Sequence, residues 1–359
     1  MIEEDIYTYR TLPWLSKSTI LGYRFCQYLF DLRYNKGIDA GVSVKAETGT
    51  NIHVLYDKFF DIVDYDELKK IVINHKKELI NTRVYHYFYK LLMEMIPVDS
   101  RAYKPYQWMI RNFALLEADH WISLNLKYPD NYIDIQNYFI PIAKEKYSEC
   151  PSLMIFGTVD RINNYEEGNL RIIYDYKTGR VPVDVRKGPK SSDIFSWKLP
   201  PKKSFELHYY LILAMTQRGF TIHPDIVAFC TQEEYFKEGV KVPKVDSYFF
   251  NSQGEPVKAK EYYRLGMIFS GDEKQPYVPK KEPIKRSLTA VFKWINFLRY
   301  IIKNKGPFNK EPNFWKCREC NETVRERCLT EEESKMIFWT SETYEKGENI
   351  VSTKDDVHK

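Results

Sequence analysis

Apolar and aromatic side chains recur at helical spacing through the first third of the chain. Residues 14–34 carry this pattern together with serines that can cap a helix, and residues 46–63 repeat it. From 66 to 127 the spacing is again helical, with interruptions near Pro97 and Pro105. We therefore expect the first third of the chain to be mainly α-helical.

After residue 130 the pattern changes to an alternation of β-branched or apolar residues with polar ones. This alternation predicts strands over 132–142, 153–163 and 170–177, with a hairpin turn at 163–168. Proline, serine and many cations over 181–204 predict a mobile basic loop. The remaining predicted elements are a helix over 205–218, strands near 225–231 and 246–250, and helices near 258–267 and 287–304.

This order of elements, helices first and then strands interleaved with helices, indicates one α/β domain built around a mixed β-sheet. We expect the domain to cover 1–334, with 54–130 as a helical insertion. Residues 335–359 are rich in charge, and we expect a flexible tail there. The sequence has no internal repeat and no low-complexity tract.

The composition narrows the class of protein. The 359 residues are 43% hydrophobic and 29% charged, which provides for a packed core and excludes a wholly disordered chain. The 54 basic residues slightly outnumber the 49 acidic ones, and this excess suits a polyanionic partner. The first residues lack the order of a secretory signal, and no apolar run reaches the roughly 18 residues of a membrane span. We expect a cytoplasmic protein with no membrane partner.

Two carboxylates and a lysine on neighbouring predicted strands carry the sharpest chemical signal. Asp160 ends the run Gly157–Asp160, and Lys177 follows Asp175 by two residues. Residues two apart on a strand share a face, so Asp175 and Lys177 point the same way. Mg²⁺ and Mn²⁺ prefer carboxylate oxygens, and a nearby lysine can hold the water that attacks a phosphodiester. An Asp-x-Lys triplet alone means little, since Asp272–Lys274 has the same pattern, but here an apolar strand precedes it.

Four short motifs in order resemble the RecB-type branch of the PD-(D/E)XK nucleases. The motifs are Gly49…His53, Gly157…Asp160-Arg161, Asp175-Tyr176-Lys177-Thr178-Gly179 and Glu206…Tyr210. The resemblance implies a restriction-endonuclease-like fold, which is an α/β fold with a mixed β-sheet core flanked by helices. It also implies a hydrolase: a DNA nuclease that uses Mg²⁺ or Mn²⁺. Such an enzyme would act as an exonuclease on single-stranded DNA or DNA ends, in recombination, repair or replication.

The same resemblance implies roles for five residues of the first three motifs. His53, Asp160 and Asp175 would be metal ligands, joined by the main-chain carbonyl of Tyr176. Lys177 would be the catalytic lysine, acting beside the two aspartates. These assignments come from the family pattern and extend the chemistry expected of the carboxylates alone.

The fourth motif departs from the family pattern, which has a glutamine where this chain has Glu206. A carboxylate at this position can bind a metal or repel phosphate, whereas Tyr210 would support the wall of the site. Both residues belong to the candidate catalytic set. An alternative interpretation follows from the departure: a DNA-binding scaffold of the same fold that has lost catalysis. The intact Asp160, Asp175 and Lys177 count against it.

Three of the six cysteines, Cys317, Cys320 and Cys328, fall within twelve residues. A Cys-x-x-Cys turn can place two sulfurs on one metal or cluster. Together with Cys26, the triplet resembles the iron–sulfur nucleases of CRISPR adaptation and the AddB-type helicase–nuclease subunits. That resemblance implies a 4Fe–4S cluster and a C-terminal closure in which 317–328 pairs with Cys26. Zinc is the alternative occupant, and a zinc-stapled structural or regulatory protein with an accidental Asp-x-Lys is a further interpretation.

The basic loop combines cations for phosphates with an aromatic side chain for unstacked bases, which suits single-stranded DNA. A solvated loop with scattered lysines is the alternative. The chain has no GxxxxGK[ST] motif, so any unwinding would come from a helicase or recombination partner. The candidate DNA contacts are Arg186, Lys187, Trp197, Lys198, Lys202 and Lys203.

Overall fold

The computed structural model groups the chain into two compact units. One unit comprises Met1–Thr11, Ser18–Val44 and Ile301–Lys359, and the other comprises Leu12–Lys17 and Lys45–Tyr300. Each unit is described by itself. The structure describes residues 13–38, 44–74, 77–129, 131–165, 169–179, 204–237, 239–271, 273, 282, 284, 288–312, 317, 320 and 322–337.

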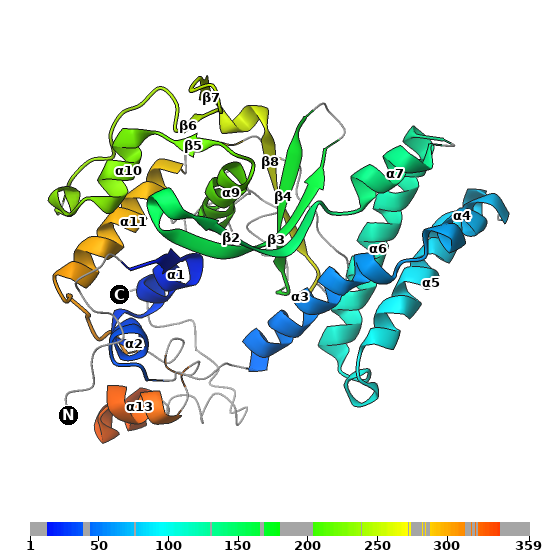
Figure 1. Ribbon diagram of the computed structural model, residues 1–359. Helices are drawn as coiled ribbons and strands as arrows, with labels where there is room; N and C mark the ends of the chain where they lie inside the picture. Colours follow the sequence, from blue (N-terminus) through cyan, green and yellow to red (C-terminus); the bar gives the residue numbers. More distant parts are fainter. Residues whose placement is uncertain are drawn as a thin grey trace, which may run out of the picture. The chain divides into compact units, whose positions relative to one another are not determined.

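The larger unit contains a five-stranded mixed sheet around β3 (Ile155–Asn164). β2 (Ala143–Cys150) pairs antiparallel with β3 along one edge. β1 (Leu15–Ser16) pairs in parallel with the start of β3, and β4 (Arg171–Lys177) pairs antiparallel with its end. β8 (Tyr263–Phe269) extends the sheet parallel to β4 (Figure 1). The predicted mixed sheet flanked by helices is confirmed.

Because β2 pairs with β3 along one edge, β1 and β4 both pair with the other edge. The two strands do not meet there. The pairing of β1 ends at Phe156, and the pairing of β4 begins at Arg161. The segment Gly157–Asp160 therefore has no partner on that edge among the described strands. The carboxyl ends of β1 and β4 both face this interruption, which makes it the natural place for polar side chains to converge.

Helix α9 (Phe205–Gln217) packs on β2, β3 and β4 and is buried along most of its length. The hydroxyl of Ser204 caps it by accepting a hydrogen bond from the N–H of Leu207. The helix lies close to β3 because Gly157 has no side chain there. A Cβ at Gly157 would lie 3.3 Å from a methyl carbon of Leu213.

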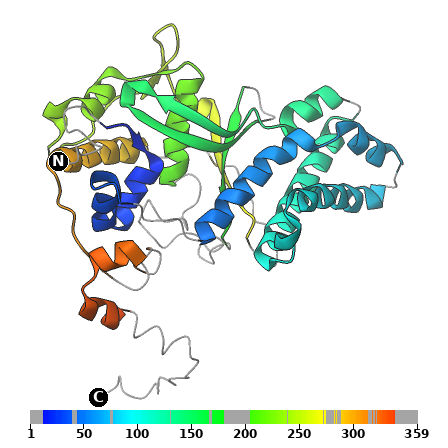
Figure 2. The same ribbon diagram turned by 60° about the horizontal axis from the view of Figure 1, so that its bottom comes forward.

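Five helices form the all-α part of the larger unit (Figure 2). They are α3 (Val44–Ile62), α4 (Tyr65–Asn74), α5 (Lys77–Met95), α6 (Lys104–Lys127) and α7 (Tyr132–Phe139). None of the described helices is long and apolar enough to span a membrane.

An aromatic core joins these helices to the sheet. Tyr56 of α3 and Phe113 of α6 stack with ring centroids 3.8 Å apart, and both rings contact Tyr176 of β4 edge to face. The same core continues through Ile172 of β4 and Ile268 of β8. The all-α part is therefore packed directly against the strand that carries the Asp-x-Lys motif.

The smaller elements complete the two units. The first unit holds most of α1 (Lys17–Phe25), α2 (Gln27–Phe30), a π-helical turn (Asp31–Asn35) and α13 (Glu322–Cys328). The remaining helices are α10 (Pro224–Thr231) and α11 (Leu288–Lys303). A second sheet consists of β5 (Thr221–Ile222), β6 (Phe249–Phe250) and β7 (Pro256–Val257). Short 3₁₀ turns lie at Val98–Ser100, Pro151–Leu153, Glu233–Tyr235 and Ala259–Glu261.

Three sequence-based predictions of secondary structure are wrong. The strand predicted over 132–142 is mostly α7, which Asn131 caps by accepting from the N–H of Asp134. The strand predicted near 225–231 is α10, which begins at Pro224 after a His223 cap. The helix predicted near 258–267 is replaced by β8, because pairing with β4 outweighs local propensity. Short apolar runs fit either period, so these errors share one cause.

Candidate active site

Side chains from five parts of the larger unit converge at the interruption in β3. Asp160 lies on β3 itself, and Lys177 ends β4. His53 comes from the middle of α3, Glu206 from the first turn of α9, and Lys17 directly follows β1. All of these side chains are less than a quarter exposed. The predicted motif residues are therefore brought together from positions more than a hundred residues apart.

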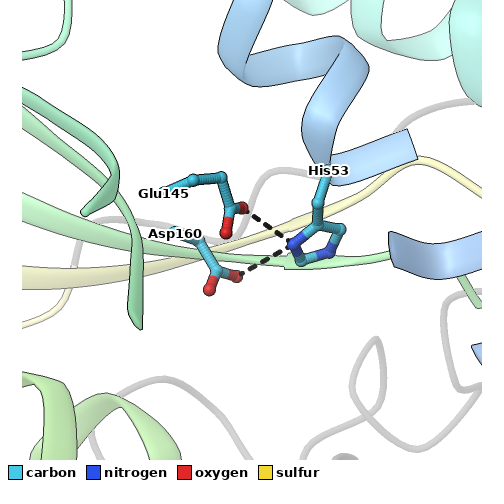
Figure 3. A group of neighbouring side chains, drawn as sticks. All are labelled: His53, Glu145 and Asp160. Carbon is cyan, nitrogen blue, oxygen red and sulfur yellow. Dashed lines mark hydrogen bonds and ion pairs between the residues drawn. The ribbon is translucent and has the colours of Figure 1, made fainter. Parts of the chain in front are cut away.

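One imidazole and two carboxylates form a compact group (Figure 3). The Nδ1 atom of His53 lies 2.9 Å from Oε1 of Glu145 and 3.9 Å from Oδ2 of Asp160. One ligand atom from each residue lies within 4.8 Å of the other two. Burial opposes the charged form of His53, but the hydrogen bond to Glu145 and the charge of Asp160 outweigh it and raise its pKa.

Glu145 is not among the residues predicted from the sequence. Charged and polar residues dominate 143–150, so that stretch has no apolar alternation that marks a strand. In the structure Lys144 and Lys146 pair with β3 on either side of Glu145, which itself has a φ of 40°. A left-handed backbone is unfavourable for glutamate, and such conformations gather at functional sites. The sequence therefore contains no signal that would have singled out Glu145.

Asp160 is held by main-chain and side-chain donors. Its Oδ2 accepts a hydrogen bond from the main-chain N–H of Tyr176 at 2.8 Å, and its Oδ1 accepts from the hydroxyl of Tyr210 at 3.1 Å. The carboxylate is 6% exposed. These bonds cross from β3 to β4 and to α9, and they fix the direction in which Asp160 points.

Asp175, Lys177 and Glu206 form a second cluster beside the first. Nζ of Lys177 lies 2.8 Å from Oδ2 of Asp175 and also donates to Oε2 of Glu206. Burial raises the pKa of Asp175 to about 7, against the opposing effect of Lys177. Burial also favours the neutral form of Glu206, but Lys17 and Lys177 outweigh it and lower its pKa to about 2. Lys17 and Lys177 act on both carboxylates, but burial dominates at Asp175 whereas the two lysines dominate at Glu206, so the two groups titrate far apart.

The residues present suit Mg²⁺ or Mn²⁺, which the fold family implies. Three carboxylates and one imidazole nitrogen form a hard donor set. Oδ2 of Asp175 is buried and accepts no well-aligned hydrogen bond from any described group, although Lys177 is near. The ammonium of Lys177 at 2.8 Å offsets its charge in the described structure, and the oxygen can also serve as a donor to a metal ion. Asp175 lies outside the compact group of His53, Glu145 and Asp160, and the carbonyl role expected of Tyr176 stays a prediction.

A buried ion pair supports the site from the helical side. The two terminal guanidinium nitrogens of Arg161 donate to the carboxylate of Glu117 on α6, at 2.5 and 3.2 Å. Nη1 also lies 3.3 Å from the hydroxyl of Tyr176. Burial disfavours an ionised Glu117, but Arg161 outweighs it and lowers its pKa. Tyr176, whose N–H holds Asp160, is thereby tied to α6.

The four predicted cluster cysteines line one hollow of the smaller unit. Cys26 lies between α1 and α2, Cys328 ends α13, and the N–H of Cys320 bonds the carbonyl of Cys317. Burial, with a smaller effect of the neighbouring thiols, raises the pKa of Cys320 and Cys328 to about 11. Among the described residues, no three of the sulfurs lie within 4.8 Å of one another. The hollow is thus common to all four thiols.

The predicted loop contacts to DNA lie in 180–203, outside the described residues. They are Arg186, Lys187, Trp197, Lys198, Lys202 and Lys203. They stay a prediction, as does the charged tail, of which 338–359 is also outside the described part.

Comparison with known proteins gives one match. The profile of the PD-(D/E)XK nuclease superfamily matches residues 14–328, which is most of the chain and includes every side chain of the candidate site. No curated protein and no solved structure matches the chain.

Proposed function

The chain belongs to the PD-(D/E)XK nuclease superfamily, and we propose that it is a divalent-metal-dependent DNA nuclease that hydrolyses phosphodiester bonds. The observation that carries this proposal is the group of His53, Glu145 and Asp160, whose ligand atoms lie within 4.8 Å of one another. The cluster of Asp175 and Lys177 lies beside it. This combination of hard ligands and an ammonium is what phosphodiester hydrolysis requires.

His53, Glu145 and Asp160 would hold Mg²⁺ or Mn²⁺, with Asp175 and the carbonyl of Tyr176 as further oxygen donors. When bound, the ion supplies Lewis-acid stabilisation of the charge that develops on the phosphate and activates a water. The hydrogen bonds from Tyr176 and Tyr210 keep Asp160 in position for this task. His53 must be neutral to act as a ligand, so it gives up its proton when the ion binds.

Lys177 supplies the second part of the chemistry. Its ammonium donates hydrogen bonds, and from the end of β4 it can hold the attacking water or a non-bridging phosphate oxygen. Glu206 and Asp175 keep this ammonium at the site before substrate arrives. We assign Lys177 as the catalytic lysine and Glu206 as a residue that positions it.

The substrate that we propose is single-stranded DNA or DNA ends, cut by an exonuclease in recombination, repair or replication. The aromatic and basic loop at 181–204 supports single strands. The sequence has no nucleotide-binding motif of a helicase, which supports a separate partner for unwinding.

We further propose that the chain belongs to the RecB-like branch and carries a 4Fe–4S cluster on Cys26, Cys317, Cys320 and Cys328. The shared hollow supports this assignment. Zinc stays the alternative occupant of the same four thiols.

End-labelled single- and double-stranded DNA, incubated with Mg²⁺ or Mn²⁺, tests the nuclease proposal. We expect the wild-type protein to degrade DNA, and Asp175→Ala and Lys177→Ala each to lose on the order of 10³-fold or more in rate. DNA binding measured in Ca²⁺ should persist in both variants. The product ladder gives the polarity and separates exonuclease from endonuclease.

Lys90→Ala is the matched control, because Lys90 is an exposed lysine of α5 that pairs with Glu94. It should cleave at the wild-type rate. If the folded wild-type protein binds DNA but cleaves none with either metal, the scaffold interpretation replaces the nuclease.

A further inference from the structure

Lys17 brings a second ammonium to the site, and no sequence motif singled it out. It directly follows β1, whose parallel pairing with β3 ends at Ser16 and Phe156. Its Nζ donates a hydrogen bond to the hydroxyl of Tyr210 at 2.5 Å and lies 3.5 Å from Oε2 of Glu206. Because Tyr210 in turn donates to Asp160, Lys17 is two hydrogen bonds from a proposed metal ligand.

The position of Lys17 is one that the stability of its helix disfavours. It is the first residue of α1, and the first turn of that helix has no acidic residue. A cation at a helix N-terminus is repelled by the helix dipole. The compensating charges come from the site: Glu206 first, and then two aspartates, outweigh burial and raise the pKa of Lys17. The placement is explained by the site and not by the helix.

Glu206 joins the two ammoniums. Its Oε2 accepts from Lys177 and lies within ion-pair distance of Lys17. The two lysine side chains are equally exposed, at 21% each, so both can be reached from solvent. Lys17 therefore has two possible roles, which are neutralising Glu206 or binding the phosphate of a substrate. Both lysines oppose the charge of Glu206, and Lys177 is also shared with Asp175, so the two roles of Lys17 have to be separated by experiment.

We propose that Lys17 is a second active-site cation that contacts a non-bridging oxygen of the nucleic-acid phosphate, with Glu206 as the residue that positions it. This inference rests on the proposed nuclease function. It divides the work at the site between two ammoniums, one on each strand end that faces the interruption in β3. A phosphate bound there would be held from both sides of the gap.

A double-mutant cycle separates the two roles of Lys17. We expect Lys17→Gln to lower kcat on the order of 10²-fold, as removal of one transition-state donor does. The double variant Lys17→Gln, Glu206→Gln should be no faster than Lys17→Gln, because the phosphate contact is still missing. Recovery of the wild-type rate in the double variant would overturn the proposal, since it would mean that Lys17 only balances the charge of Glu206.

Binding provides a readout that does not depend on cleavage. In Ca²⁺, the affinity of a short fluorescent single-stranded oligonucleotide is measured against salt concentration. Lys17→Gln should lower the magnitude of the slope of log affinity against log salt by about 0.7, which is the loss of one phosphate contact. The control is Lys144→Gln, because Lys144 is 23% exposed and pairs with Asp57 and Asp61 outside the site. Its slope should match the wild type.

The two readouts distinguish failure of this inference from failure of the proposed function. If the wild-type protein does not cleave, the nuclease proposal fails, and the salt slope alone decides whether Lys17 contacts phosphate. If the wild-type protein cleaves but Lys17→Gln behaves like Lys144→Gln in both rate and slope, the phosphate contact is refuted while the nuclease stands.

Discussion

The carboxylate site and the cysteine hollow differ in what holds their ligands in place. The carboxylate site draws on long elements, including the ten residues of β3 and the nineteen of α3, and a continuous aromatic core backs it. The hollow draws on α2 and α13, of four and seven residues. Its described apolar contacts are small clusters such as Leu32 with Val324. Long elements and a shared core organise the first site, whereas short helices and small apolar clusters surround the second.

This difference has a thermodynamic meaning. A ligand that binds only the folded form stabilises that form. Where few apolar contacts hold a unit together, this binding free energy is a larger share of the unit's stability. We therefore expect metal at the hollow to be required for the fold of its unit. Metal at the carboxylate site should add chemistry to a structure that is already formed.

The largest expected effect is the selective loss of one metal when a ligand of either site is replaced. Cys320→Ser should remove iron from anaerobically purified protein and leave Mn²⁺ binding in place, because the carboxylate ligands are untouched. Asp160→Asn should do the reverse. Elemental analysis and the visible absorption spectrum measure iron, and calorimetry measures Mn²⁺. A colourless, iron-free wild-type protein loaded with zinc would contradict the cluster and favour the zinc-stapled interpretation.

A smaller effect should follow from breaking the ion pair behind the carboxylate site. Glu117→Gln leaves the buried guanidinium of Arg161 without its countercharge and should cost about 3–5 kcal/mol of unfolding free energy. Urea unfolding measures it. Glu94→Gln is the matched control, because Glu94 is 57% exposed and its pair with Lys90 should contribute less than about 1 kcal/mol. Equal loss in the two variants would mean that the pair does not organise the site.

The smallest effect is the pH dependence of metal affinity. Burial raises the pKa of Asp175 to about 7, and the pKa of His53 is also raised, so both groups carry protons in mildly acidic solution. Metal binding must displace them. The affinity for Mn²⁺ should therefore rise with pH, by at most about tenfold per unit for each proton released, and level off above the folded-state pKa values.

Calorimetry in buffers of different ionisation enthalpy counts the released protons. His53→Asn is the informative variant, because it removes one titrating ligand and should release about one proton fewer than the wild type. An affinity that is flat between pH 5 and 8 would contradict the protonated resting state of these ligands.

The sequence predicted those parts of the molecule whose signal is local. β3, β4, α3 and α9 each have a periodicity of their own, and Asp160, Asp175 and Lys177 stand in a recognisable order. Glu145 and Lys17 carry no such signal, because each reaches the site through strand pairing and helix placement. β8 was mistaken for a helix for the same reason, since its neighbour β4 determines its conformation.

The left-handed backbone at Glu145 sets the stability of the fold against the proposed metal-binding role of this residue. Glycine would adopt a φ of 40° without penalty, whereas glutamate is strained there by about 1–2 kcal/mol. Selection for heat resistance alone would therefore drive position 145 towards glycine, and selection for catalysis would restore the acid. A library with position 145 randomised, screened first for heat resistance and then for nuclease activity, would show how much stability is lost in keeping the acid.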